Sequence, residues 1–148
     1  MAGSDLQPDR LALLADLAER FGLHAIYLFG SRAKEMSRFL RGERMLDPAR
    51  HSDVDVGVMP APGQQLTVRD KVRLAIALED MWDVERVDLV VLPQASPFLA
   101  VDIVAGERVY TRDAYTMDEY ELYVLRRAGD LEPFERERRR RLLWEKHP

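Results

Sequence analysis

The chain has 148 residues, of which 47% are hydrophobic and 32% are charged. This length fits one domain with a single core, and the ordinary composition argues against disordered and fibrous classes. The absence of cysteine excludes disulfides, thiolate metal sites and a cysteine nucleophile. A formal net charge of −4 argues against a surface built to grip nucleic acid, so no direct, stable nucleic-acid binding is expected.

The N-terminal segment is polar and acidic and has no apolar stretch behind it, which does not match a secretory signal peptide. No apolar run approaches the roughly 20 residues that a bilayer-spanning helix needs. We therefore expect a cytoplasmic protein with no membrane partner.

Hydrophobic periodicity predicts alternating helices and strands along the chain. Helices are expected over residues 8–21, 32–40, 67–82 and 97–106, with a polar loop over 41–52. Strands are expected over residues 24–29, 53–59, 86–92 and 108–111, the last of them at a sheet edge. This order is typical of an α/β (α+β) fold, here a small mixed sheet of about four strands flanked by helices.

The third helix should begin at Thr67, because Thr67 and Asp70 have the spacing of a capping box. A helical repeat of apolar residues follows this start. We expect the buried face of the helix to be formed by Val68, Val72, Ala75, Ile76 and Trp82.

A further helix is predicted after residue 113, where apolar residues recur on one helical stripe: Met117, Tyr120, Val124, Ala128 and Leu131. Gly129 and Pro133 should break or kink it before an arginine-rich last helix. That last stretch is either a solvated face or a surface for an acidic partner or an RNA. We expect one domain over 1–148, with a core of about 8–113 and a C-terminal extension of about 114–148 containing extra helices.

A Gly-Ser pair follows the first apolar strand, where a turn into a helix is expected. Glycine permits a sharp turn and the close approach of a ligand. A serine hydroxyl and the free N–H groups of a helix start can hold a phosphate. Gly30, Ser31 and Arg32 are therefore candidate nucleotide-binding residues, although the pair alone is typical of an ordinary turn and Arg32 of a solvated helix face.

Two aspartates open the second strand. Asp53 and Asp55 alternate with apolar residues, so they project from one face with α-carbons roughly 6.5–7 Å apart. Like charges side by side on a strand are unfavourable unless a cation neutralises them. Carboxylate oxygens suit hard cations such as Mg²⁺ or Mn²⁺, whereas an exposed edge with both aspartates in water is the alternative.

A third acid, Asp88, stands inside the apolar third strand. An acid in such a run is costly to bury without a partner or a metal. We expect this strand to be central and buried on both faces, which would put Asp88 at the mouth of a site or near a cation. A strand-end acid that caps a neighbouring backbone is the alternative interpretation.

Three carboxylates on adjacent strands, beside a turn that can cradle phosphates, are typical of two-metal phosphoryl transfer. The pattern resembles the nucleotidyltransferase superfamily of the DNA polymerase beta type. More closely, the chain is similar to the minimal nucleotidyltransferase (MNT) domains that serve as antitoxins beside HEPN-domain toxins. The resemblance spans nearly the whole chain and is carried by residues 26–33, 52–56, 87–91 and 97–113.

The resemblance implies a polymerase-beta-like fold and a Mg²⁺-dependent transfer of AMP from ATP. It implies that Gly30 and Ser31 hold the phosphates and that Asp53 and Asp55 ligate two Mg²⁺ ions, with Mn²⁺ as the alternative. Asp88 would bind the catalytic metal and accept the proton of the attacking hydroxyl. The implied acceptor is a tyrosine of a partner HEPN toxin, which the modification silences in a hetero-oligomer.

Two features depart from the family pattern. The segment from Arg32 to Ser52 is about twice the usual length, and Glu35 stands where the family often has glycine. Both bear on the shape of the nucleotide pocket. Two other functions therefore stay open: an antitoxin that neutralises its toxin by binding alone, and a nucleotidyltransferase that acts on a small molecule.

The three histidines are poorer candidates for chemistry. His24, His51 and His147 are scattered and have no partner at metal-ligand spacing. We expect no catalytic role for any of them, with His51 the closest to the acids.

Overall fold

The computed structural model describes residues 9–48 and 52–146. Its strands form one mixed sheet in the order β3-β2-β1-β4. β1 pairs antiparallel with β2 and β4, whereas β2 and β3 run parallel. The strands are β1 (Leu23–Phe29), β2 (Val54–Pro60), β3 (Val87–Val91) and β4 (Glu107–Thr111).

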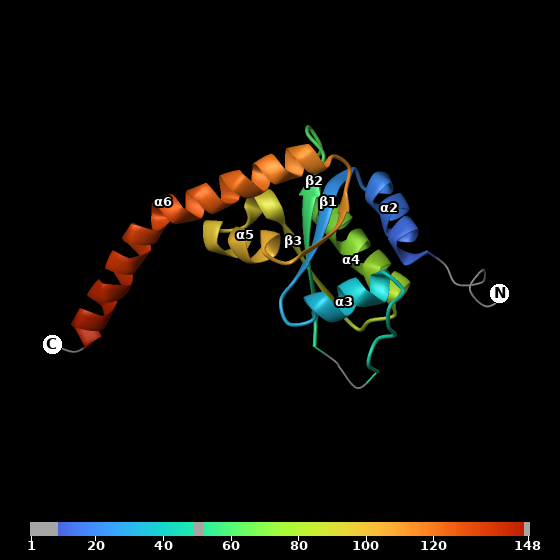
Figure 1. Cartoon of the computed structure of the whole chain (residues 1–148), viewed down its shortest axis with the longest axis horizontal. Helices are drawn as coiled ribbons and strands as arrows, with labels where there is room; N and C mark the ends of the chain where they lie inside the picture. The colour runs from blue at the N-terminus through green and yellow to red at the C-terminus, as the bar shows by residue number, and fades with distance from the viewer. Residues whose placement is uncertain (1–8, 49–51, 147–148) are drawn as a thin grey trace.

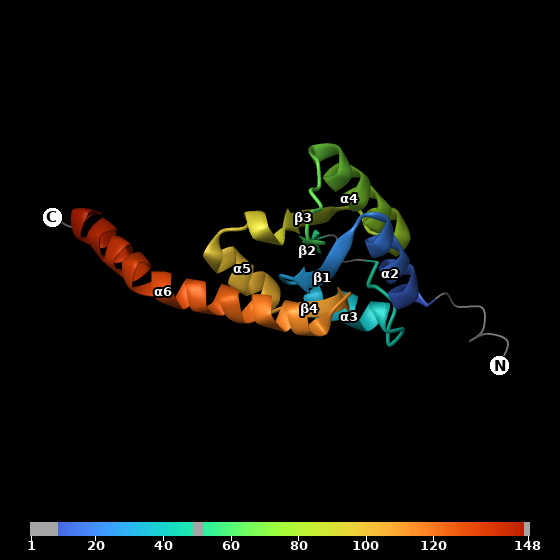
Figure 2. The same cartoon turned by 90° about the horizontal axis from the view of Figure 1, so that it is seen from above.

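Helices cover both faces of this sheet, as Figures 1 and 2 show. The helices are α2 (Arg10–Arg20), α3 (Ala33–Leu40), α4 (Val68–Trp82), α5 (Pro97–Val104) and α6 (Ala114–Lys146), with a short 3₁₀ turn η1 (Leu92–Gln94). Buried residues of α2, α3 and α4 pack on one face of the sheet, and those of α5 and α6 pack on the other. The architecture confirms the expected small mixed sheet flanked by helices.

β1 is buried on both faces, which explains its apolar sequence from Ala25 to Phe29. Ile26 and Leu28 belong to the core beneath α2, α3 and α4. Ala25 and Tyr27 belong to the core beneath α5 and α6. The Tyr27 hydroxyl donates to Glu121, which also pairs with Arg108, so β1 is tied to the first half of α6.

The start of α4 is capped as predicted. Thr67 Oγ1 accepts from the Asp70 N–H at 3.1 Å, and the Asp70 carboxylate accepts from the Thr67 N–H at 2.9 Å. The expected buried face of α4 is wrong in part. Leu74 and Leu78 are buried with Trp82, whereas the remaining side chains at the predicted face include three exposed ones: Val68, Val72 and Ile76. Both stripes have helical spacing, and the one rich in leucine faces the sheet.

Of the break or kink predicted at Gly129 and Pro133, the break does not occur, and a single helix takes the place of the expected helices. α6 runs without interruption over 33 residues with Pro133 inside it, and its axis bends in Figure 1. Past Ala128 none of its described side chains is buried. Intrahelical ion pairs such as Arg136–Glu132 at 3.0 Å and Arg138–Glu135 at 2.7 Å help the exposed half to stay helical. No helix in the described part of the chain has the length and apolarity needed to cross a membrane.

Candidate active site

The three predicted acids meet at one edge of the sheet. This is the edge at which β1 ends and both β2 and β3 begin, because β1 is antiparallel to β2. Asp55 is the register partner of Asp88 on one side and of Phe29 on the other. Asp53 lies one residue ahead of β2. The sequence prediction of carboxylates on adjacent strands is therefore matched by the register.

The carboxylate of Asp55 lies on the α5 side of the sheet. Alternation along β2 sends Val54 and Val56 into the core under α3 and α4, so Asp55 points the other way. Gly57, on the same side as Asp55, packs so closely on Ile103 of α5 that an added Cβ would overlap that side chain. The end of the sheet that carries Asp53, Asp55 and Asp88, called the acidic edge below, thus lies beside α5.

Gly30 brings the turn after β1 against this edge. Its φ is +76°, in the left-handed region that glycine adopts without strain. A Cβ at this position would overlap the Asp55 carboxylate. The glycine therefore serves two needs, because it permits the turn and leaves room for the acid.

The acids interact electrostatically. The pKa of Asp55 is raised above its usual range, first by burial and then by the nearby charges of Asp88 and Asp53. The carboxylate of Asp53 lies 3.6 Å from Arg86 Nε in an exposed ion pair. Such a cluster of like charges is what a bound cation would relieve.

The environment of Asp88 differs from the prediction. β3 is an edge strand of the sheet, not a central one, and Asp88 is exposed. The apolar run was misread because Val87 and Val91 pack under α4 while the residues between them are only partly covered. Asp88 nevertheless lies directly beside Asp55, and its place at the mouth of a site stays a prediction.

A hollow of about 710 Å³ lies beside the Gly-Ser turn. Gly30, Ser31 and Lys34 line it from the turn and the start of α3. Asp102 and Glu107 line it from α5 and β4. A hollow that combines a helix start with a lysine suits phosphate groups.

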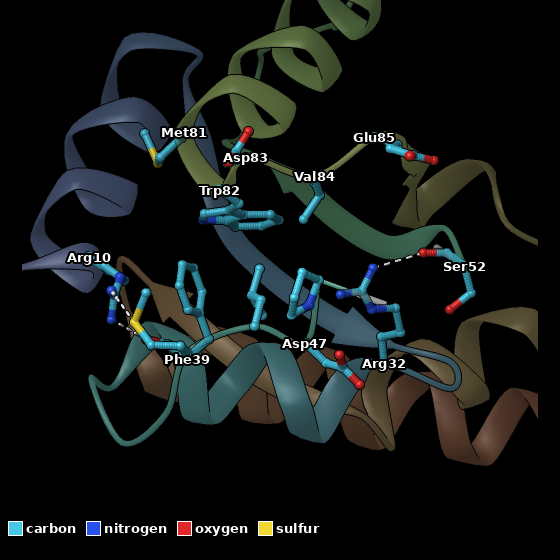
Figure 3. A pocket seen from close by; sticks show the side chains of 13 residues that line it. Arg10, Arg32, Phe39, Asp47, Ser52, Met81, Trp82, Asp83, Val84 and Glu85 are labelled. Atoms are coloured by element: carbon cyan, nitrogen blue, oxygen red, sulfur yellow. Dashed lines mark hydrogen bonds between the residues drawn. The ribbon is translucent and has the colours of Figure 1, made fainter. Parts of the chain in front are cut away.

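Arg32 lines a different cavity. This second cavity has a volume of about 480 Å³ and lies between α3, the segment after it and the end of α4 (Figure 3). Phe39 and Trp82 face each other across it. Arg32 Nε donates to Glu35 at 3.0 Å, and Arg32 Nη1 donates to the Ser52 carbonyl at 2.9 Å. The role predicted for Arg32 at the nucleotide stays a prediction.

The acids at this edge are possible metal ligands, but their side chains are not arranged around a common point. Within residues 9–48 and 52–146, no group of three or more acidic or histidine side chains is close enough to hold a metal ion as it stands. Carboxylate oxygens are nevertheless the kind of donor that suits Mg²⁺, which proteins hold with a few carboxylates together with substrate phosphates. His24 is buried at the start of β1. His51 and His147 lie outside the described residues.

A mixed sheet with paired carboxylates at one edge, next to a glycine-serine turn at a helix start, defines a nucleotidyltransferase domain. A family model described as "Polymerase beta, Nucleotidyltransferase" matches residues 14–115 of the chain. The chain belongs to this family. The match confirms the expected class of enzyme. A comparison with curated proteins finds no match.

Solved structures give the same fold. A toxin–antitoxin structure with AMP-PNP matches with a TM-score of 0.69 at 21% identity, over 90% of this chain and 98% of that one. The MNT antitoxin bound to a tri-AMPylated HEPN toxin of Shewanella oneidensis matches with a TM-score of 0.66 at 20% identity, over 90% and 96%. A MntA–HepT mutant with two aspartates changed to glutamate matches with a TM-score of 0.69 at 20% identity, over 90% and 98%. The predicted resemblance to MNT antitoxins is confirmed at the level of fold.

Proposed function

We propose that this chain is a Mg²⁺-dependent adenylyltransferase in which a hydroxyl of a partner protein attacks the α-phosphate of ATP, so that AMP is transferred to the hydroxyl and pyrophosphate leaves. The observation that carries the proposal is the register of the acids. Asp55 stands directly beside Asp88 on the neighbouring strand. Asp53 precedes Asp55 by two residues, and the turn at Gly30 contacts Asp55. Carboxylates and a phosphate-binding turn in contact are the parts that phosphoryl transfer needs.

The hollow beside the Gly-Ser turn receives the triphosphate. Gly30 and Ser31 present the backbone and hydroxyl of the turn to the phosphates. Arg32 is the last residue of this turn, at the N-cap of α3. Lys34 lines the same hollow and adds a positive charge. ATP held here has its α-phosphate next to the acidic edge, because Gly30 and Asp55 are in contact.

Asp53, Asp55 and Asp88 would hold two Mg²⁺ ions, with Mn²⁺ as the alternative. Bound Mg²⁺ neutralises the charge that develops on the phosphate oxygens. To reach this arrangement Asp53 leaves its exposed ion pair with Arg86, which is a weak contact. Asp88 is exposed and accepts the proton of the incoming hydroxyl. The acceptor therefore approaches from solvent.

A HEPN-type toxin is the proposed partner, and a tyrosine hydroxyl is the proposed acceptor. The proposal draws on two neighbours, one with AMP-PNP and one with a tri-AMPylated HEPN toxin. A third neighbour has two aspartates changed that lie two positions apart, the spacing of Asp53 and Asp55. Under this proposal the protein acts in the cytoplasm, where ATP is abundant.

One observation favours a second candidate, an antitoxin that neutralises its toxin by contact alone. The part of α6 that follows Ala128, called its outer half, stands away from the domain (Figure 2). It carries Phe134, which is 73% exposed. A helix of this kind could cover a partner without any chemistry. The two candidates differ in whether the acids are needed.

A labelling experiment separates them. ATP labelled at the α-phosphate or at the γ-phosphate is incubated with this chain, Mg²⁺ and the proposed HEPN-type partner. The proposal predicts label on the partner from the α position only, and none with Asp53→Asn, Asp55→Asn or Asp88→Asn. A triple aspartate variant that still neutralises the toxin, with no label transferred by the wild type, would establish the binding antitoxin instead.

A further inference from the structure

Arg32 and Glu35 form a buried ion pair inside α3 and the turn before it. Their side chains are only 4% and 5% exposed. Glu35 accepts from Arg32 Nε at 3.0 Å and from Arg32 Nη2 at 3.4 Å, so the guanidinium is held in a two-point contact. Buried charges persist only where such geometry satisfies them.

The pair holds the later part of the segment that joins α3 to β2. Glu35 Oε2 accepts from the Asp47 N–H at 3.3 Å, which ties this part of the segment back to α3. Arg32 Nη1 donates to the Ser52 carbonyl at 2.9 Å, which holds the backbone where β2 is about to start. Ser52 directly precedes Asp53.

A second contact holds this backbone beside the start of β3. The Val54 N–H donates to the Arg86 carbonyl at 3.0 Å. The short stretch that carries Asp53 is therefore held at Ser52 by Arg32 and at Val54 by the residue before β3. Loss of the first contact frees one side of the aspartate pair.

The guanidinium of Arg32 faces away from the hollow beside the Gly-Ser turn, called the phosphate hollow below. Gly30, Ser31 and Lys34 line that hollow, whereas Arg32 lines the cavity shown in Figure 3. Nε, Nη1 and Nη2 all donate to partners within the chain. Contact with a phosphate would require Arg32 to give up contacts that keep its charge satisfied.

We infer that Arg32 and Glu35 are positioning residues, which set the backbone of Ser52 and so the separation of Asp53 and Asp55, and that Arg32 does not bind the nucleotide. The inference rests on the proposed function of the acidic edge. Supporting contacts of this kind govern metal affinity and turnover, since they fix the orientation of the groups that act.

The test uses the full chain and compares four variants: Arg32→Lys, Arg32→Met, Glu35→Gln and the double variant Arg32→Met/Glu35→Gln. The control is Arg38→Met, which removes an exposed arginine of the same helix whose contact with Glu43 is 3.8 Å. The double variant removes both buried charges together, so it stays informative if a lone charge prevents folding. Thermal melts establish which variants are folded.

Two readouts are measured on the folded variants. Mn²⁺ affinity in the presence of AMP-PNP is followed by electron paramagnetic resonance, which does not depend on catalysis. We expect it to fall by about tenfold or more in every Arg32 variant. In AMP transfer we expect kcat to fall by a similar factor while the KM for ATP stays within about twofold. Arg38→Met should leave both readouts unchanged.

The outcomes are distinct. A KM for ATP raised about tenfold with unchanged Mn²⁺ affinity would show that Arg32 binds the nucleotide, and unchanged values in all variants would show that the pair only stabilises the fold. Either result overturns the inference. Lack of AMP transfer by the wild type would defeat the proposed reaction alone, because the Mn²⁺ readout would still decide the role of the pair.

Discussion

Gly30 is the residue at which backbone shape and acid chemistry meet. Gly30→Ala would force a side chain into a backbone with φ +76° and into the Asp55 carboxylate. We expect the free energy of unfolding to fall by about 1–2 kcal/mol and AMP transfer to be lost. Chemical denaturation and the transfer assay measure the two effects.

Gly42→Ala is the matched control for this change. Gly42 has the same φ of +76°, but nothing lies within 4 Å of an added Cβ. It should reproduce the backbone strain and leave activity intact. Equal loss of activity in both variants would mean that the contact between residue 30 and Asp55 is unimportant.

The folded protein should be less stable with an ionised Asp55 than with a neutral side chain at this position. Because burial and the charges of Asp88 and Asp53 raise its pKa in the folded state, ionised Asp55 opposes folding. Asp55→Asn should raise the Tm at neutral pH by about 1–3 °C while abolishing transfer.

The pH dependence fixes the sign of this effect. The gain from Asp55→Asn should be present above the raised pKa and should disappear as the pH falls toward the unfolded value of 3.8, where the wild-type carboxyl is protonated too. Melts over this range, with the exposed Asp16→Asn of α2 as control, measure it. A lower Tm for Asp55→Asn at neutral pH would contradict the repulsion.

The sequence identified the acids but not the contacts of Arg32. Asp53, Asp55 and Asp88 stand out because acids interrupt apolar strands, and that signal is local. Arg32 pairs with Glu35 three residues away and with Ser52 across a loop. The spacing of an arginine and a glutamate on a helix is common on solvated faces, so only burial in the fold distinguishes this pair.

The outer half of α6 is the element that we expect to meet the partner. Phe134→Ala should weaken the complex with the HEPN-type protein about tenfold, because an exposed aromatic side chain is a frequent anchor of interfaces. Tyr115→Ala is the matched control, since Tyr115 is also 73% exposed but lies at the other end of α6. Calorimetric titration measures both affinities.

ATP binding separates this effect from damage to the domain. Neither variant should change the affinity for AMP-PNP, since both side chains lie outside the phosphate hollow. Unchanged affinity of Phe134→Ala for the partner would remove the outer half of α6 from the proposed interface.

Among the elements, local signals predicted segments correctly, whereas helical periodicity failed where two apolar stripes competed. β1 and the capped start of α4 were predicted because their signals are local. The buried face of α4 was not, because Val68, Val72 and Ile76 repeat as regularly as Leu74 and Leu78. The position of β3 at the edge depends on strand order, which no segment of sequence carries by itself.

For the whole molecule, one sheet edge collects the groups that the proposed reaction needs, and one helix projects away from it. The sheet order brings Asp55 and Asp88 together although they are 33 positions apart in the chain. The fold class followed from the alternation of helices and strands. The assembly of acids and turn at one edge followed from two pairings, the antiparallel one of β1 with β2 and the parallel one of β2 with β3.

Intact mass spectrometry of the HEPN-type partner, after incubation with this chain, ATP and Mg²⁺, tests adenylyl transfer most directly. Asp53→Ala serves as the control, and complex formation is recorded in parallel. We predict a mass gain of one or more AMP units with the wild type and none with Asp53→Ala. An unchanged mass in a stable complex of the two chains would contradict adenylyl transfer and leave the antitoxin acting by contact.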